Sequence, residues 1–439
     1  MLARIQECIL YRGFSDGEML NNMAELINLY ESDEEALKAK EDQFFKSING
    51  LVELAGMYGF SGNIWHTYLT FLLVNHENAF SMASEIRGAI KGSINDLAKN
   101  DFQIFKELYD FDITVFDRVF GTVCCKVICD YQTPDENSKL FNTRIRDRIC
   151  QMSKTLAAAA TTEEFMDDMV SFYKDFGVGK LGLHKAFRIG HDENGKVEIQ
   201  PITRIAHVKI DDLVGYEIAK KKLIENTEAF VQGRKANNCL LFGDAGTGKS
   251  SSIKGILNQY YDQGLRIIEA SKHQFQDLDE VIAQIKNRNY RFIIYMDDLS
   301  FEEFEIEYKY LKAVIEGGLE KKPDNVLIYA TSNRRNLVRE RAADKLEIAD
   351  EDDLHSSDTV QEKLSLVYRF GVRIYFGKPD KKQFQEIVRT LAARYGVTMP
   401  EDELLLKANQ WELSHGGLTG RAAQQFIDYI VGTEEEKRK

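Results

Sequence analysis

One octet, GDAGTGKS at positions 243–250, constrains the fold of this chain more than any other feature. It follows the short apolar run 239–242 and precedes apolar residues at helical spacing, Ile253, Ile256 and Leu257. A strand, a glycine-rich turn and a helix in this order form a phosphate-binding loop, whose glycines let backbone N–H groups point at a polyphosphate. An ordinary glycine-rich turn is the alternative, but such an octet rarely falls by chance between a buried strand and an amphipathic helix. The octet therefore predicts binding of a nucleoside triphosphate.

The octet also assigns candidate roles to single side chains. We expect the Lys249 ammonium to contact the outer phosphates and the Ser250 hydroxyl to bind Mg²⁺. The positive end of the helix dipole adds to the attraction for phosphate. The candidate nucleotide contacts of this segment are Gly243, Asp244, Ala245, Gly246, Thr247, Gly248, Lys249, Ser250 and Ser251.

Length and charge limit the class of protein. A chain of 439 residues is too long for one compact core, so we expect two or three domains. The formal net charge of −13 makes the whole chain a poor general binder of polyanions. The longest apolar stretch, 68–74, is far shorter than the roughly twenty residues of a membrane span. Without an apolar N-terminal core or cleavage signal, we expect a cytoplasmic protein that does not contact membranes.

The six cysteines do not form a metal-binding or redox motif. They lie at positions 8, 124, 125, 129, 150 and 239, and none makes a Cys-x-x-Cys pair. The 124–129 group lies in an apolar run. Reduced, buried thiols are the expected state, with a metal site or disulfide as the less favoured alternative.

The spacing of apolar residues changes along the chain. Residues 1–180 have helical spacing of apolar residues and predict a large N-terminal all-α domain. Residues 181–205 alternate around Asn194-Gly195 and predict a β-hairpin connector. Residues 206–377 alternate short apolar runs with helical segments, which is typical of a parallel sheet flanked by helices. Residues 378–439 predict three helices that form a small C-terminal helical lid.

A second motif lies at the end of an apolar run about fifty residues beyond the octet. The run 292–296 ends in Asp297 and Asp298, which we expect at the carboxyl edge of the sheet. Asp297 can hold the water shell of Mg²⁺, and Asp298 can polarise an attacking water. Alternatively, the pair could be two surface acids that cap the next helix. The run 326–330 leads to Asn333, whose amide could orient a water, although an isolated asparagine is more often a turn former.

Two arginines complete the candidate constellation. Arg369 precedes Phe370-Gly371, and Arg421 lies in the sequence GGLTGR at 416–421. Each guanidinium, taken alone, could equally be a solvated surface charge. Read together with the phosphate loop and the two polar strand ends, they form part of a resemblance to a known family.

In order and spacing, these motifs resemble an AAA+ ATPase over about residues 206–433. More narrowly, the chain resembles the bacterial AAA+ ATPases predicted in the group called domain of unknown function 815. The stretches that carry this likeness are 236–238, 297–301, 329–335 and 362–366.

The resemblance implies an α/β P-loop NTPase core with ATP and Mg²⁺ as cofactors. It implies that 213–216, including Val214 and Gly215, line the adenine pocket and that 243–250 are the Walker A motif. Asp297 and Asp298 become Walker B, Asn333 sensor 1, Arg369 the arginine finger and Arg421 sensor 2. Most AAA+ proteins have glutamate where Asp298 stands, which makes slow hydrolysis plausible. Arg334 and Arg335 directly follow sensor 1 and are further candidates for the arginine that acts on a neighbouring subunit.

The leading hypothesis is an Mg²⁺-dependent ATPase whose hydrolysis drives a conformational change of a partner. The alternative is a slow-turnover, nucleotide-gated loader or switch that acts through its ATP-bound form. A small-molecule kinase is disfavoured because nothing resembles an acceptor-substrate lid. We expect a homo-oligomer, and the sequence leaves open whether a further partner is protein or nucleic acid.

Overall fold

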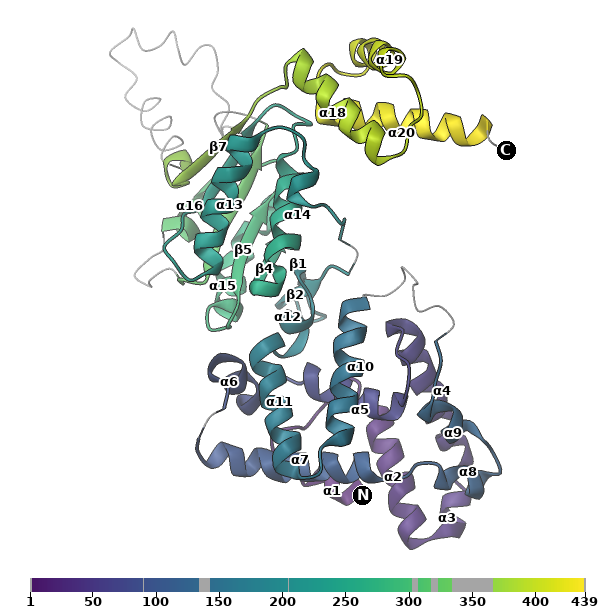
Figure 1. Ribbon diagram of the computed structural model, residues 1–439. Helices are drawn as coiled ribbons and strands as arrows, with labels where there is room; N and C mark the ends of the chain where they lie inside the picture. Colours follow the sequence, from purple (N-terminus) through teal and green to yellow (C-terminus); the bar gives the residue numbers. More distant parts are fainter. Residues whose placement is uncertain are drawn as a thin grey trace. The chain divides into compact units, whose positions relative to one another are not determined.

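The computed structural model describes residues 2–89, 91–133, 143–203, 205–301, 307–316, 323–333 and 366–437. Within these ranges the chain forms two compact units, Met1–His184 and Lys185–Lys439 (Figure 1). No helix in the described part of the chain is long and apolar enough to span a bilayer. Each unit has its own hydrophobic core, so each is described separately.

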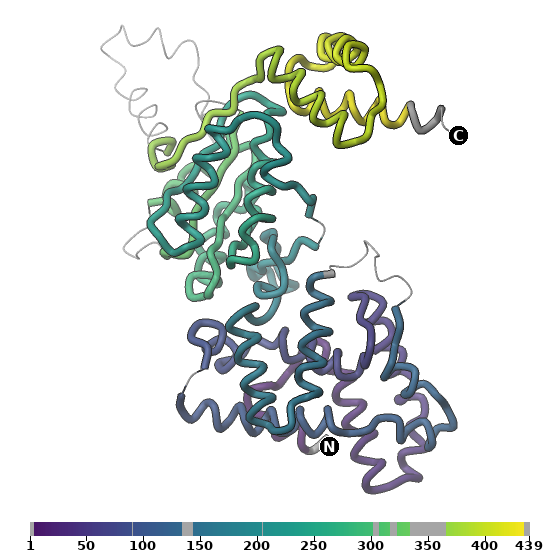
Figure 2. The backbone as a smooth tube through the Cα atoms, in the orientation of Figure 1, coloured from purple at the N-terminus to yellow at the C-terminus, as the bar shows by residue number. Residues whose placement is uncertain are grey.

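The first unit is built of helices in its described part, as the apolar spacing predicts (Figure 2). The longest apolar stretch of the sequence falls in α5, whose side chains are buried all round, so α5 forms the centre of this unit. The helices of this unit are α1 (Leu2–Gln6), α2 (Glu18–Ser32), α3 (Glu34–Lys38), α4 (Glu41–Tyr58), α5 (Ile64–Asn75), α6 (Ala79–Arg87), α7 (Ser93–Asp110), α8 (Val115–Phe120), α9 (Cys124–Cys129), α10 (Thr143–Ala158), α11 (Thr162–Phe176) and α12 (Gly179–Leu183).

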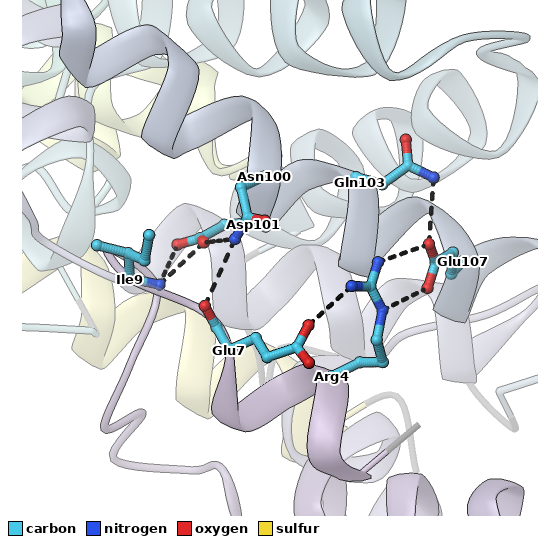
Figure 3. A network of polar contacts seen from close by, with 7 residues as sticks. All are labelled: Arg4, Glu7, Ile9, Asn100, Asp101, Gln103 and Glu107. Carbon is cyan, nitrogen blue, oxygen red and sulfur yellow. Dashed lines mark hydrogen bonds and ion pairs between the residues drawn. The ribbon is translucent and has the colours of Figure 1, made fainter.

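A polar network ties the N-terminal segment to α7 (Figure 3). The Arg4 guanidinium donates to Glu107 at 2.9 Å and to Glu7 at 2.7 Å. Deeper in the unit, the fully buried Asp101 carboxylate accepts hydrogen bonds from the backbone N–H groups of Ile9, Leu10 and Tyr11. Buried charge needs such partners, and here the backbone of residues 9–11 supplies them.

The second unit is built on a seven-stranded sheet with the order β2-β1-β4-β5-β6-β3-β7. From β4 to β7 the neighbouring strands are parallel. Consecutive residues of β5 and β6 are buried, so both faces of these central strands are covered. This explains why the strands read as continuous apolar runs in the sequence. The strands are β1 (Ala186–His191), β2 (Val197–Pro201), β3 (Cys239–Gly243), β4 (Leu265–Glu269), β5 (Arg291–Met296), β6 (Val326–Ser332) and β7 (Val372–Phe376).

Helices cover the sheet, as the alternating pattern predicts. Apolar residues of α13 and α14 share one core with one face of β3, β5, β6 and β7. The flanking helices of the described part are α13 (Glu217–Val231), α14 (Lys249–Tyr260), α15 (Leu278–Ile285) and α16 (Glu307–Glu316). The fold is therefore the predicted P-loop NTPase arrangement of a mostly parallel sheet flanked by helices.

The predicted hairpin forms, but it lies within the sheet rather than between two domains. β1 pairs antiparallel with β2 and parallel with β4, so Phe187 lies opposite Ile268. The segment 181–205, expected as a connector, thus supplies β1 and β2 to the sheet of the second unit, with β2 at one edge. Its turn is closed by Asp192, whose N–H donates to the Lys196 carbonyl, with Gly195 at a positive φ of 77°. Glycine reaches this conformation without a steric penalty.

Three helices follow β7 and have their own small core: α18 (Lys381–Arg394), α19 (Glu401–Ser414) and α20 (Gly420–Lys437). Asp380 caps α18 by accepting a hydrogen bond from the Gln383 N–H at 2.8 Å. Val214, which lies ahead of α13 in the sequence, packs against this small core. The predicted lid thus contacts the rest of the second unit through this residue.

Candidate functional site

The phosphate loop connects the carboxyl end of β3 to the first residue of α14, Lys249. Gly243, Gly246 and Gly248 have φ angles of +135°, +75° and +92°, which side chains other than glycine rarely adopt. A Cβ atom at Gly243 would also overlap the Phe376 backbone. Local geometry therefore requires these glycines. The loop ends at the N-terminus of a twelve-residue helix, where unpaired N–H groups attract anions.

Lys249 lies across this loop. Its side chain is almost fully buried, and Nζ donates to the carbonyl oxygens of Gly243 at 3.0 Å and Asp244 at 2.6 Å. Burial lowers the pKa of Lys249, whereas the negative charges of Asp298, Asp244 and Asp297 act in the opposite direction. The ammonium therefore rests on weak backbone acceptors, which a phosphate could replace.

Ser250 joins the loop to the strand that ends in two aspartates. Its hydroxyl donates to Asp297 Oδ1 at 2.8 Å, across a sequence separation of 47 residues. The same oxygen accepts hydrogen bonds from the Tyr295 hydroxyl and the Thr331 hydroxyl, both at 2.6 Å. Burial alone would raise the pKa of Asp297, but the hydrogen bonds from Thr331, Tyr295 and Ser250 outweigh it and lower that pKa. Asp297 is thus held as a carboxylate.

Asp298 and Asn333 meet next to this cluster. The Asn333 amide donates to Asp298 Oδ1 at 2.7 Å, and the Asp298 N–H donates to Thr331 Oγ1 at 2.9 Å. Asp298 has a positive φ of 50°, which costs energy in a residue other than glycine. Parallel strands β5 and β6 bring these residues together because their carboxyl ends lie at the same edge of the sheet.

The lid and the segment before α13 border the loop as well. The Arg421 N–H donates to the Gly246 carbonyl at 3.2 Å. A Cβ atom at Gly248 would lie 3.4 Å from Leu213 Cδ2, and Gly215, two residues further, has a positive φ of 80°. Leu213 and Arg421 therefore lie close to the phosphate loop, and Val214 and Gly215 follow Leu213 directly in the chain.

The remaining loop residues have different surroundings. Thr247 is buried, and its hydroxyl donates to the Asp244 carbonyl at 2.8 Å. Ala245 is exposed, and Ser251 is half-buried in the first turn of α14. The Asp244 carboxylate accepts a hydrogen bond from the Lys378 N–H at 3.0 Å, so it contacts the entry to the lid.

Arg369 is the candidate that the structure does not bring to the loop. Its guanidinium forms an ion pair with Glu316 at the end of α16, and its Nε is buried without a hydrogen-bond partner in the described part of the chain. Arg334 and Arg335, the other candidate arginines, lie outside the described residues.

Our sequence analysis did not single out Tyr295 and Thr331, the partners of Asp297. It named Asp244 as a nucleotide contact but not as a contact of the lid. A signal for Tyr295 was present, because residues i and i+2 of a strand point to the same face. Tyr295 therefore had to share a face with Asp297. No local pattern predicts the contacts of Thr331 or Asp244, because both partners are distant in sequence.

Comparisons with known proteins bear on the second unit. A family model described as "Protein of unknown function (DUF815)" matches residues 182–434, which is more than half of the chain. A curated relative, the replication factor C large subunit of Staphylothermus marinus, is 35% identical over 77 residues. That match covers 17% of this chain and only 18% of the relative.

Among solved structures, three RuvB chains of Thermotoga maritima are similar, and one is described as a Holliday junction branch migration motor. Two are mutants, with 18% and 14% identity and TM-scores of 0.35 and 0.32; the branch migration motor has 14% identity and a TM-score of 0.31. Each covers 50% of this chain, and the matched parts are 64%, 71% and 71% of those chains. We infer no activity or partner from these values.

Proposed function

This chain belongs to the DUF815 family, and from that premise and the geometry of its phosphate loop we propose that it is an Mg²⁺-dependent ATPase of the AAA+ type. The observation that carries the proposal is the 2.8 Å hydrogen bond between Ser250 and Asp297. It joins the first turn of the helix after the phosphate loop to the carboxylate at the end of β5. Two motifs that the sequence separates thus meet where a nucleotide-bound metal would lie.

The residues present suit the binding of a triphosphate. The glycines leave the loop backbone open, and the N-terminus of α14 adds partial positive charge. We propose that Lys249 exchanges its two carbonyl acceptors for phosphate oxygens when ATP enters. Charge-assisted bonds to phosphate are stronger than bonds to neutral carbonyls, so this exchange favours binding.

The donor set suits Mg²⁺. Mg²⁺ prefers oxygen ligands, keeps several waters and uses one or two protein groups together with the phosphates. Ser250 and Asp297 supply such groups. In the described part of the chain, no cluster of three or more His, Cys, Asp or Glu could hold a metal without such help. When bound, the ion would neutralise charge that develops on the phosphates.

The two residues next to the metal position are candidates for the hydrolytic step. We propose that Asp298 polarises the attacking water and that Asn333, 2.7 Å from it, orients the same water. Arg421 lies beside the loop at the start of α20 and would place a further positive charge near the phosphates. Arg369 would act on the nucleotide of a neighbouring subunit, since its guanidinium pairs with Glu316 and has no contact with the loop among the described residues.

Contacts between the phosphate loop and the lid could couple ATP binding to a movement of the lid. The loop touches the lid at Asp244–Lys378 and at Gly246–Arg421. A change in loop geometry on ATP binding would therefore act on the lid at its entry and at the start of α20. We propose that this motion is passed to a partner, protein or nucleic acid, within a homo-oligomer.

The six cysteines are free thiols, which supports a reducing, cytoplasmic location.

One observation favours the slower alternative, a nucleotide-gated loader or switch. Asp298 is one methylene shorter than glutamate, and its Oδ1 is already engaged by Asn333. An engaged, short carboxylate polarises water less effectively. Such a protein would bind ATP tightly, turn over slowly and act in its ATP-bound form.

Steady-state turnover together with equilibrium ATP binding tests the proposal. We expect saturable binding of ATP that Mg²⁺ strengthens and release of phosphate that EDTA abolishes. Binding without measurable turnover would favour the switch. A full-length protein that binds no ATP in the presence of Mg²⁺ would contradict both functions.

A further inference from the structure

The contacts of Asp297 contain a residue that the proposed mechanism does not use. Tyr295 lies two positions earlier on β5, so the two side chains emerge on the same face of the sheet. Its ring is packed in the core shared with α13 and α14 and is only 6% exposed. Its hydroxyl donates to Asp297 Oδ1 at 2.6 Å, shorter than the 2.8 Å bond from Ser250.

We propose that the Tyr295 hydroxyl, together with Thr331, is a positioning group that fixes Asp297 Oδ1 so that the other carboxylate oxygen, Oδ2, faces the water shell of the bound metal. The inference rests on the proposed function, and it names residues that hold the metal-binding carboxylate without touching the metal.

Geometry supports this assignment. Ser250, Tyr295 and Thr331 come from three elements, α14, β5 and β6, and all donate to the same oxygen. None of these donors uses Oδ2. The Ser250 hydroxyl can still donate its hydrogen bond to Asp297 while a lone pair of its oxygen binds the metal. Tyr295 and Thr331 are buried, so water cannot replace them easily if they are removed.

Two effects of losing the Tyr295 hydroxyl oppose each other. One fewer donor makes Asp297 more basic and strengthens its attraction for a cation. It also lets the carboxylate rotate, which weakens a bond that depends on direction. We expect orientation to prevail, because removing groups that orient metal ligands usually lowers metal affinity by about 10–100-fold.

The chain offers a matched control. Tyr329 lies directly opposite Tyr295 on the neighbouring strand β6, and its ring is buried in the same core. Its hydroxyl, however, meets Asn226 and Thr227 of α13. Tyr295→Phe and Tyr329→Phe therefore remove the same atom from equivalent packing, but only the first removes it from Asp297.

The experiment titrates full-length protein and a fixed concentration of ATP with Mn²⁺, which takes the same oxygen ligands and is detected by electron paramagnetic resonance. We expect Tyr295→Phe to raise the Mn²⁺ concentration for half-saturation about tenfold. This is the lower end of the range given above, because Ser250 and Thr331 still hold Oδ1. Tyr329→Phe should match wild type, and ATP binding in EDTA should be equal in all three proteins.

Thr331 supplies a second pair of variants if Tyr295→Phe does not fold. Thr331→Val removes the hydroxyl at similar volume, whereas Thr331→Ser keeps it. We expect the valine variant to require more Mn²⁺ and the serine variant to resemble wild type.

The outcomes are separable. Saturable Mn²⁺ binding by wild type, with the same or a tighter requirement in Tyr295→Phe, would overturn this inference alone. A wild-type protein that shows no metal-dependent binding of ATP would overturn the proposed function and this inference with it. An equal rise in Tyr329→Phe would show general loosening of the core and would also overturn it.

Discussion

Among single residues, we expect Lys249 to matter most directly for nucleotide binding. Its ammonium is buried and rests on two loop carbonyls, so it is already placed where phosphate oxygens would enter. We expect Lys249→Ala to weaken ATP binding at least about tenfold, because a charge-assisted bond inside a preorganised loop is lost. Equilibrium binding measures this, with exposed Lys254→Ala on the same helix as the control. Equal affinity of the Lys249→Ala and control proteins would contradict the phosphate-loop assignment.

The adjacent aspartates should separate chemistry from metal binding. Asp298→Asn keeps an oxygen to accept the Asn333 bond but removes the charge that polarises water, so we expect ATP binding to persist and hydrolysis to fall. Asp297→Asn disturbs a carboxylate with three side-chain donors and should impair metal-dependent binding as well. Phosphate release and ATP binding are compared in the two variants. Wild-type turnover in Asp298→Asn would place the base elsewhere, and Glu302 and Glu303, outside the described residues, would be tested next.

Thiol reactivity tests the predicted state of the cysteines. Burial raises the pKa of Cys129 to about 11 and of Cys8 to about 12. Because the thiolate is the reactive form and exists mainly above the pKa, these thiols should alkylate slowly at neutral pH while the protein is folded. Mass spectrometry after iodoacetamide treatment should show protection that denaturant removes. Rapid alkylation of Cys8 in native protein would contradict its burial.

At the scale of elements, Asp101 on α7 holds the N-terminal segment in place. Three backbone N–H groups, those of Ile9, Leu10 and Tyr11, share this one carboxylate (Figure 3 shows its bond to Ile9). We expect Asp101→Ala to destabilise the segment by about 3 kcal/mol, since bonds to a charged acceptor are lost and donors are left unpaired. Hydrogen exchange at the amides of residues 9–11 should accelerate. The control is Asp96→Ala, an exposed position at the start of α7, which should leave these amides protected.

At the scale of the whole molecule, we expect Arg369 to link hydrolysis to assembly. Its guanidinium pairs with Glu316 rather than with its own phosphate loop, so we expect it to act across a subunit interface. An arginine that reaches the transferring phosphate of a neighbour is worth roughly 10³–10⁵ in rate. Arg369→Ala should therefore bind ATP but hydrolyse it poorly, and wild-type specific activity should rise with protein concentration.

Mixing two inactive proteins gives the sharper measurement. At an interface where the Arg369 of a Lys249→Ala subunit faces the intact loop of an Arg369→Ala subunit, activity should return. If the mixture stays inactive although the two variants assemble together, Arg369 is not the trans-acting residue. Arg334 and Arg335 would then be examined in the same way. Activity that is independent of dilution down to a demonstrated monomer would rule out the trans mechanism.

Local patterns in the sequence determined most of the second unit. The strands β3 to β7 coincide with apolar runs, and the phosphate loop has positive φ angles at three of its glycines. Asp297, Asp298 and Asn333 could be placed at the carboxyl edge of the sheet because they lie at the ends of two buried strands. These features depend on neighbours along the chain, and short-range spacing is what a sequence displays directly.

Tertiary structure decided the rest, because contacts between residues far apart in sequence leave no local pattern. The hairpin could be recognised from alternation, but only the parallel pairing of β1 with β4 made it part of the sheet. Likewise, Asp297 could be identified at a strand end, but its bonds to Ser250 and Thr331 depend on which strands and helices are neighbours. The ion pair of Arg369 with Glu316 on α16 likewise leaves no local pattern in the sequence. The sequence by itself determined which residues could do the chemistry, and the packing of the sheet determined which of them meet.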